Sequence, residues 1–284
     1  MKVTVNELFS YGNERLKEAG IRDHKTDASL FLQHALNKDR TYILVHGDDP
    51  VEEKAEEVYR GYIEKRCLRI PLQQIVGFAD FMGLEFYVNP SVLIPRFDTE
   101  FLVEEMMKYV DDGSRVLDMC TGTGCILLSL MCYKNDIEDV GADISEEALE
   151  VAVRNRDKLI YEEKLHGNAE FVKSDLFESI GGTFDHIASN PPYIRSEEID
   201  GLEEEVKDHE PRTALDGGYD GLDFYRRIAD EAHKYLNREG RLFLEIGYDE
   251  GDEVRGIFEE KGYRDIRILK DYSGNERVMI CLNR

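Results

Sequence analysis

The stretch Arg115-Val116-Leu117-Asp118-Met119-Cys120-Thr121-Gly122-Thr123-Gly124 runs from an apolar strand into a glycine-containing loop, and a helix is predicted over 126–131 directly after it. Glycine has no Cβ, so such a loop lets the backbone approach a ligand closely. A loop that binds a nicotinamide dinucleotide would read GxGxxG, with the pyrophosphate at the N-terminus of the helix. Only Gly122 and Gly124 are glycines here, and Cys120 takes the first loop position. The stretch therefore predicts a ligand-binding strand–loop–helix unit without identifying the ligand.

On both sides of this loop, from about residue 98 onward, apolar strands alternate with helical stretches. The predicted strands are 115–118, 139–143, 170–173, 186–189, 242–246, 263–269 and 278–282. Alternation of this kind predicts a parallel sheet with helices on both faces. The last two strands flank the turn Ser273-Gly274-Asn275-Glu276 and form a hairpin, so we expect the final strand to be antiparallel. This order resembles the Rossmann-like, seven-stranded, class I S-adenosylmethionine-dependent methyltransferases, an α/β fold.

The region before the sheet is of a different kind. Residues 1–75 are predicted to form a helical bundle, with a capping-box spacing at Thr4 and Glu7 and a helix that begins at Pro50. Aromatic residues and glycines then indicate a β-hairpin linker over 76–97. We therefore divide the chain into a bundle at 1–75 for partner binding, the linker, and a methyltransferase domain at 98–284.

Composition restricts the setting of the protein. The net charge is 36 − 60 = −24, which argues against a protein that binds duplex DNA or a membrane surface through a basic face. Five cysteines without a CxxC pair indicate free thiols in a reducing cytosol and no metal spacing. No signal peptide and no apolar run of membrane-spanning length is apparent, so we expect a cytoplasmic protein.

Acidic residues follow three successive predicted strands. Asp118 and Asp143 are 143 − 118 = 25 residues apart, close to the spacing of about 20 that is expected for an acid on ribose hydroxyls. Asp175 follows the third strand, and Leu176 and Phe177 next to it are interpreted as an apolar wall for adenine. Each acid alone could equally be a helix N-cap. Together they predict a site for a cationic sulfonium cofactor at this edge of the sheet.

The segment Asn190-Pro191-Pro192-Tyr193 follows another apolar strand. The Asn190 side-chain oxygen and the Pro191 carbonyl are two acceptors, and proline keeps the segment rigid. Tyr193 offers a flat ring on which a planar amide or base can stack. Two acceptors that hold both hydrogens of an NH2 group would direct its lone pair, and this chemistry suits methyl transfer to nitrogen.

Longer segments carry a more specific resemblance. The most specific are Leu93-Ile94-Pro95-Arg96-Phe97-Asp98-Thr99-Glu100 and Ala214-Leu215-Asp216-Gly217-Gly218. Further matching segments are 71–77, 86–92, 118–124, 190–193, 210–213, 220–222, 245–247 and 271–277. Together they resemble the release-factor glutamine N5-methyltransferases of the HemK/PrmC type, from about residue 68 to the C-terminus. Two departures stand out: Phe97 stands where the family usually has proline, and Cys120 where the general cofactor loop has glycine.

The resemblance implies methylation of the glutamine in the Gly-Gly-Gln loop of a peptide chain release factor, with S-adenosylmethionine converted to S-adenosylhomocysteine. It implies catalytic roles for Asn190, Pro191 and Tyr193. The implied cofactor-binding residues are Asp118, Thr121, Gly122, Gly124, Asp143, Asp175, Leu176 and Asn190. The implied substrate-binding residues are Asn190, Pro191, Pro192, Tyr193, Pro95 and Arg96. Alternatively, Arg96 forms a surface ion pair with Asp98 or Glu100, worth about 0–1 kcal/mol. We expect a monomer without a metal, without a membrane and without direct contact to nucleic acid.

Other functions remain open at this point. A nucleic-acid amino-methyltransferase acting on adenine, cytosine or guanine would use Asn-Pro-Pro-Tyr on a flipped base, but it would need a basic cleft. A non-catalytic binding module that has kept the fold is a second alternative. A Rossmann oxidoreductase is a third, which the missing third glycine disfavours.

Overall fold

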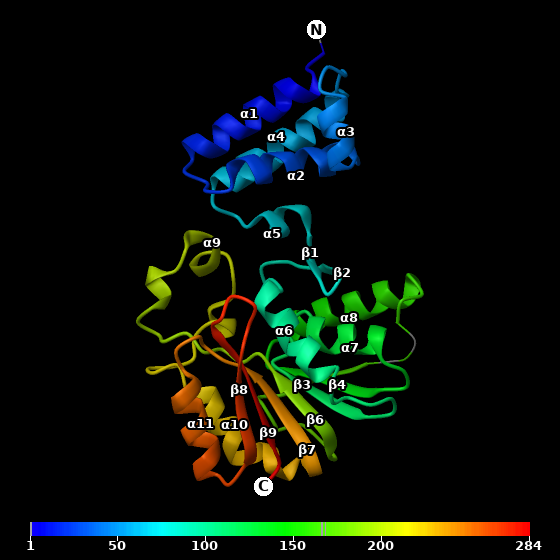
Figure 1. Ribbon diagram of the computed structural model, residues 1–284. Coiled ribbons are helices and arrows are strands. Elements are labelled where there is room, and N and C mark those ends of the chain that lie inside the picture. The colour runs from blue at the N-terminus through cyan, green and yellow to red at the C-terminus, as the bar shows by residue number, and fades with distance from the viewer. Residues whose placement is uncertain (1, 166, 168) are drawn as a thin grey trace. The chain divides into compact units, whose positions relative to one another are not determined.

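The computed structural model describes residues 2–165, 167 and 169–284, and these residues divide into two compact units (Figure 1). Of the described residues, those within 2–78 and 203–209 form the helical unit, and those within 79–202 and 210–284 form the sheet unit. None of the helices in the described ranges combines the length and the apolar character that a bilayer crossing requires.

The helical unit packs its helices around one apolar core. Its helices are α1 (Val5–Glu18), α2 (His24–Leu36), α3 (Arg40–Val45), α4 (Glu53–Cys67), α5 (Leu72–Val76) and α9 (Glu204–Lys207). The capping box at Thr4 and Glu7 is present, as predicted. The predicted helix start at Pro50 is wrong, because Pro50 forms a bridge with Thr4 and Val51 donates its N–H to the carbonyl of Val3. These bonds hold the chain extended, so α4 begins only at Glu53.

A segment distant in sequence completes this unit. Residues 203–209, which carry α9, are held by Arg66, whose guanidinium donates to Asp27 at 2.7 Å and to Glu205 at 2.9 Å. All three side chains are largely shielded from water, so removal of one of them would leave a buried charge without its partner, at a cost of about 3–5 kcal/mol. Sequence periodicity assigns residues 203–209 to the sheet unit, because it contains no signal for this long-range contact.

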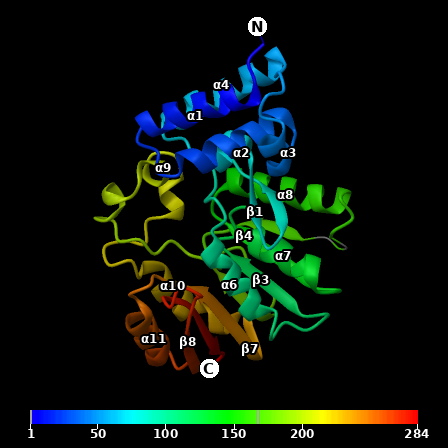
Figure 2. The same ribbon diagram turned by 45° about the horizontal axis from the view of Figure 1, so that its top comes forward.

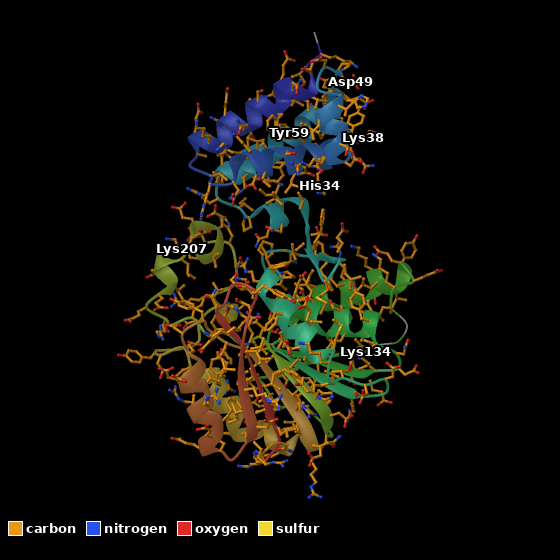
Figure 3. The ribbon with its side chains drawn as sticks, viewed as in Figure 1. His34, Lys38, Asp49, Tyr59, Lys134 and Lys207 are labelled. Carbon is orange, nitrogen blue, oxygen red and sulfur yellow. The ribbon has the colours of Figure 1, made fainter. Side chains whose placement is uncertain are left out.

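Two glycines of the helical unit provide a matched stability test. An added Cβ at Gly12 would lie 2.0 Å from the hydroxyl of Tyr59, a fully buried side chain of α4 (Figure 3). We expect Gly12→Ala to lower the free energy of unfolding by about 1–3 kcal/mol, because the packed ring has no room to move. A Cβ at Gly61 of α4 meets no atom within 4 Å, so Gly61→Ala should gain up to about 1 kcal/mol of helix propensity. Hydrogen exchange of α1 and α4 amides in the full chain measures both, and equal effects would contradict this packing.

The sheet unit contains a seven-stranded sheet. A two-stranded hairpin precedes it, formed by β1 (Phe78–Phe81) and β2 (Leu84–Tyr87). The sheet strands are β3 (Arg115–Met119), β4 (Glu138–Asp143), β5 (Glu170–Lys173), β6 (Phe184–Ser189), β7 (Leu236–Glu245), β8 (Arg264–Lys270) and β9 (Glu276–Leu282). Their order is β5-β4-β3-β6-β7-β9-β8, and β9 pairs antiparallel with both of its neighbours. The predicted seven-stranded class I methyltransferase fold with an antiparallel last strand is therefore confirmed.

Helices cover both faces of this sheet (Figures 1 and 2). The helices of the sheet unit are α6 (Phe97–Met106), α7 (Cys125–Tyr133), α8 (Glu146–Tyr161), α10 (Asp223–Glu231) and α11 (Gly251–Glu260). Side chains of α6, α7 and α8 share a core with Val116 and Phe243, whereas α10 and α11 share one with Leu117 and Leu244. Neighbouring strand residues thus face opposite cores, as the pleat requires. Both faces of the sheet are buried, so a ligand can reach the sheet only at the ends of its strands.

Candidate active site

A cavity of about 450 Å³ lies at the carboxyl ends of β3, β4, β5 and β6. The strand order reverses direction between β3 and β6, and open α/β sheets bind ligands at such a switch point. The residues that line it and bear on the chemistry are Pro95, Arg96, Thr99, Cys120, Thr121, Gly122, Asp143, Ile144, Asp175, Leu176, Asn190, Pro192 and Arg227. Most of the predicted site residues therefore meet at one cavity.

The glycine loop follows β3 in a left-handed conformation. Gly122 has φ +54° and Gly124 has φ +78°, both easily adopted without a Cβ. Gly124 also lies close to α7, since an added Cβ would be 3.0 Å from a methyl carbon of Leu128. Cys120 has φ +60°, so it takes the conformation that glycine would take at this position, at a cost of about 1–2 kcal/mol. Cysteine at this position therefore carries backbone strain that glycine would not carry.

Asp143 fastens the loop to the end of β4. Its Oδ2 accepts the backbone N–H of Gly122 at 2.9 Å, and its Oδ1 accepts that of Ser145 at 2.9 Å. Burial raises the pKa of Asp143, and the two backbone hydrogen bonds oppose that shift. The carboxylate lines the cavity with lone pairs still available, so it can accept hydrogen bonds from ligand hydroxyls.

Asp118 has a different place from the one predicted for it. It is fully buried and is not among the residues that line the cavity. Its Oδ2 accepts the hydroxyl of Thr121 at 2.6 Å, which ties the loop to β3. Its effect on a ligand is therefore indirect: it shapes the loop, while Thr121 and Gly122 are the groups exposed to the cavity.

Asp118 predicts a pH-dependent stability. Burial raises its pKa from 3.8 to about 7, so its contribution to stability is complete below about pH 4 and is lost as the pH rises through about 7. Asp118→Asn keeps an oxygen for Thr121 and does not titrate. As the pH rises from about 5 to about 8, the free energy of unfolding of this variant should increase by about 2 kcal/mol relative to that of the wild type. Urea unfolding without ligand measures both free energies at each pH. Other buried acids titrate in both proteins and cancel, so a pH-independent difference would contradict the assignment.

Asp175 and Leu176 form the wall after β5. Asp175 Oδ1 accepts from Arg227 Nη2 at 2.7 Å, and both residues line the cavity. Leu176 has φ +49°, and its carbonyl accepts the Ser174 hydroxyl at 2.6 Å. Its apolar side chain is thus held at the cavity by a strained backbone, as often occurs at ligand sites.

The Asn-Pro-Pro-Tyr segment follows β6. Asn190 and Pro192 line the cavity, whereas Pro191 and Tyr193 are not among its lining residues. The Asn190 Nδ2 donates to the Thr99 hydroxyl at 3.2 Å, and the Tyr193 hydroxyl donates to Glu245 Oε1 at 3.2 Å. Burial raises the pKa of Tyr193 well above its ordinary value.

Arg96 pairs with a residue that is distant in the sequence. Its Nη2 lies 2.5 Å from Glu210 Oε1, and Glu210 Oε2 accepts the N–H of Ile94 at 3.1 Å. The Glu210 side chain is only 1% exposed. The alternative of a surface pair with Asp98 or Glu100 is therefore wrong, because a buried acid 114 positions away binds Arg96 instead.

Three side chains of the site were not assigned a role from sequence: Thr99, Glu210 and Glu245. Each lies inside a segment that resembles the family, but a segment match does not say which side chain contacts which. Among the described residues, no group of three or more histidine, cysteine or acidic residues could hold a metal ion, and the five cysteines are free thiols.

Comparisons with known proteins cover most of the chain. Residues 7–77 match the PrmC N-terminal domain family, and residues 96–206 match the Methyltransferase small domain family. The "Release factor glutamine methyltransferase" of Clostridium acetobutylicum is 40% identical over 272 residues, which span 94% of each chain. The protein of the same name from Geobacter sulfurreducens is 38% identical, over 97% of this chain and 95% of its own.

Among solved structures, a methyltransferase from Pyrococcus furiosus has a TM-score of 0.53 and 21% identity, over 78% of this chain and 98% of its own. At that identity the likeness concerns the fold alone.

Proposed function

This chain belongs to the family of release factor glutamine methyltransferases, and on that premise we propose that it methylates the side-chain amide nitrogen of the glutamine in the Gly-Gly-Gln loop of a peptide chain release factor. Such a protein–glutamine N5-methyltransferase takes the methyl group from S-adenosylmethionine and modulates translation termination.

One observation carries the proposal most directly. Asn190, an amide side chain with an oxygen acceptor, lies on the same cavity as Asp143 and the glycine loop. A group suited to hold a carboxamide and a group suited to ribose hydroxyls therefore line the same cavity. Transfer between two bound molecules requires this arrangement, because good alignment can lower the barrier by about 7–11 kcal/mol.

The cavity residues fit S-adenosylmethionine. When bound, this cofactor supplies a methyl group on a positively charged sulfur. Among the described residues, Asp143 is bound only by backbone N–H groups, so its negative charge favours a cation over an anionic pyrophosphate, whereas Asp175 is paired with Arg227. Gly122 leaves open space for close backbone approach, since an added Cβ there meets no atom within 4 Å. Leu176 and Ile144 provide apolar surface for a base.

The segment after β6, residues 190–193, would act on the substrate nitrogen. An amide nitrogen is a weak nucleophile because its lone pair is delocalised. The Asn190 oxygen, which lines the cavity, would accept one of its hydrogens, and the carbonyl of Pro191, the next residue in the chain, would have to turn to the cavity to accept the other. The two acceptors would orient the lone pair and stabilise the positive charge that develops on the nitrogen. Pro192 and the neighbouring Pro95 and Arg96 would border the entrance for the glutamine side chain.

The helical unit is the part that we assign to binding the release factor. Two large apolar side chains of α3, Leu44 and Val45, are 75% and 72% exposed and would supply apolar surface for this contact. We propose a monomeric enzyme that contacts the factor and no nucleic acid. Because release factors act on the ribosome, the reaction would take place in the cytoplasm.

A parallel assay tests this function. The full chain is incubated with radiolabelled S-adenosylmethionine and, separately, with a release factor, a short Gly-Gly-Gln peptide, DNA and RNA. Label in the release factor, with a lower KM than for the peptide, is the expected result, because the peptide lacks a surface for the helical unit. Label in DNA or RNA alone would establish the nucleic-acid amino-methyltransferase instead.

A further inference from the structure

We infer that Asn155 is a positioning residue for the cofactor site, and that its buried carboxamide joins two walls of the cavity. The inference rests on the proposed function for the identity of the ligand, S-adenosylmethionine, and on hydrogen bonds for its geometry. Asn155 lies in α8, is fully buried and is not among the residues that line the cavity. It therefore acts through the backbone groups that it binds.

The first of these walls is the glycine loop. The Asn155 Nδ2 donates to the backbone carbonyl of Thr123, a residue that lines the cavity, at 3.0 Å. The side chains of Asp118 in β3 and Asp143 in β4 hold the two preceding residues of the loop. Three successive loop residues are thus held by three side chains, each from a different element of the fold.

The second wall begins at the end of β2. The Asn155 Oδ1 accepts the backbone N–H of Tyr87 at 2.6 Å, and its Nδ2 donates to the carbonyl of the same residue at 3.1 Å. Residues 91–93, 95 and 96, which follow a few positions along the chain, line the cavity. The carboxamide that holds the loop thus also holds the backbone from which this second wall starts.

The three partners allow the carboxamide one orientation. Only its oxygen can accept the N–H of Tyr87, and only its NH2 group can donate to carbonyls. Both NH2 hydrogens are used, one for Tyr87 and one for Thr123. A flipped carboxamide would place NH2 against N–H and oxygen against oxygen, so Asn155 fixes both walls in one arrangement.

Apolar packing of α8 supports the same two walls. An added Cβ at Gly124 in the glycine loop would lie 3.4 Å from the Cβ of Ala152 in α8, which is ordinary contact distance. The apolar cluster between α8 and the second wall includes Ala148, Val151, Val88, Val92 and Ile94. Asn155 adds directed hydrogen bonds to this packing.

Loss of the carboxamide should reduce the fraction of molecules that are ready to bind the cofactor. The carbonyl of Thr123 and both backbone groups of Tyr87 would lose their partner, and the loop would no longer have one preferred position. The apparent Kd rises by the inverse of the fraction with a correctly placed loop. A loop that is correctly placed about a tenth of the time would bind the cofactor about tenfold more weakly.

Asn155→Ala and Leu159→Ala form the matched pair that tests this role. Leu159 lies one turn further along α8 and is also fully buried. Both substitutions remove buried atoms and should destabilise the fold, but only the first releases the loop. By calorimetry, we expect Asn155→Ala to weaken binding of S-adenosylhomocysteine roughly tenfold and Leu159→Ala to leave it within about twofold. In Asn155→Ala, the KM for S-adenosylmethionine should rise with little change in kcat. Equal losses of affinity in the two variants would overturn the inference.

Amide hydrogen exchange in the wild type gives a second test that requires no variant. The Tyr87 N–H is bound by Asn155, and the Met82 N–H, at the turn of the same hairpin, is bound by Glu100, both at 2.6 Å. Because Asn155 joins Tyr87 to the glycine loop, S-adenosylhomocysteine should slow exchange at Tyr87 roughly tenfold more than at Met82. Equal slowing at the two positions would contradict the coupling.

These measurements separate the inference from the proposed function. If the wild type binds S-adenosylhomocysteine but methylates no release factor, the proposed function fails, and the affinities and exchange rates still decide the role of Asn155. If it binds no S-adenosylhomocysteine, exchange without ligand decides. The N–H of Gly124, which donates to the Thr121 carbonyl at 2.8 Å, should then exchange roughly tenfold faster in Asn155→Ala than in Leu159→Ala. Equal rates in these two variants would overturn the positioning role.

Discussion

Asn190→Ala should lower the rate of methyl transfer by about 100- to 1,000-fold, the cost typical of losing one preorganised hydrogen-bond group at a reacting centre. The variant loses the oxygen that would hold the substrate amide, while the glycine loop and Asp143 are untouched. Single-turnover methylation of a release factor measures the effect.

The control for this variant is cofactor binding. Calorimetry with S-adenosylhomocysteine should give an affinity within about threefold of the wild type, because one side chain at the edge of the cofactor region contributes at most a neutral hydrogen bond. A variant that binds cofactor normally and still turns over at the wild-type rate would remove Asn190 from the chemistry.

Asp143→Asn should weaken cofactor binding roughly 10- to 100-fold, since hydrogen bonds to a charged group are worth about 1.5–3 kcal/mol. The new NH2 group cannot accept, so either Gly122 or Ser145 loses the partner of its backbone N–H. The negative charge next to a cationic cofactor is lost as well. Titration calorimetry with S-adenosylmethionine measures the change directly.

Asp139→Asn is the matched control on the same strand. Asp139 is also a buried acid of β4, but it does not line the cavity. Its replacement should leave cofactor affinity unchanged. Equal losses in both variants would mean that the effect comes from β4 as a whole and not from contact at the cavity.

The strands and their order could be predicted because local patterns determine them. Each strand of the sheet is an apolar run between helical stretches, and the seven observed strands overlap the seven predicted ones. Spacing also located the acids at the strand ends. It could not say which way each side chain turns: Asp143 faces the cavity, whereas Asp118 turns inward to Thr121. That choice depends on packing around the loop, which no local pattern records.

Contacts between distant segments account for what the sequence did not reveal. Arg96 binds Glu210, Asn190 binds Thr99, and residues 203–209 join the helical unit through Arg66. In each pair, the local sequence around one residue gives no sign of its distant partner. The departure at Cys120 is a further case, since only the backbone angle shows that cysteine there adopts a conformation normally left to glycine.

The central claim is that Asn190 and Pro191 hold a glutamine carboxamide beside the methyl donor. A fragment-ion mass spectrum of a release factor after incubation with enzyme and S-adenosylmethionine tests it most directly. The account predicts one added methyl group on the side-chain nitrogen of the glutamine in Gly-Gly-Gln with wild-type enzyme, and almost none with Asn190→Ala in the same time. A methyl group at any other residue, or equal methylation by both enzymes, would contradict it.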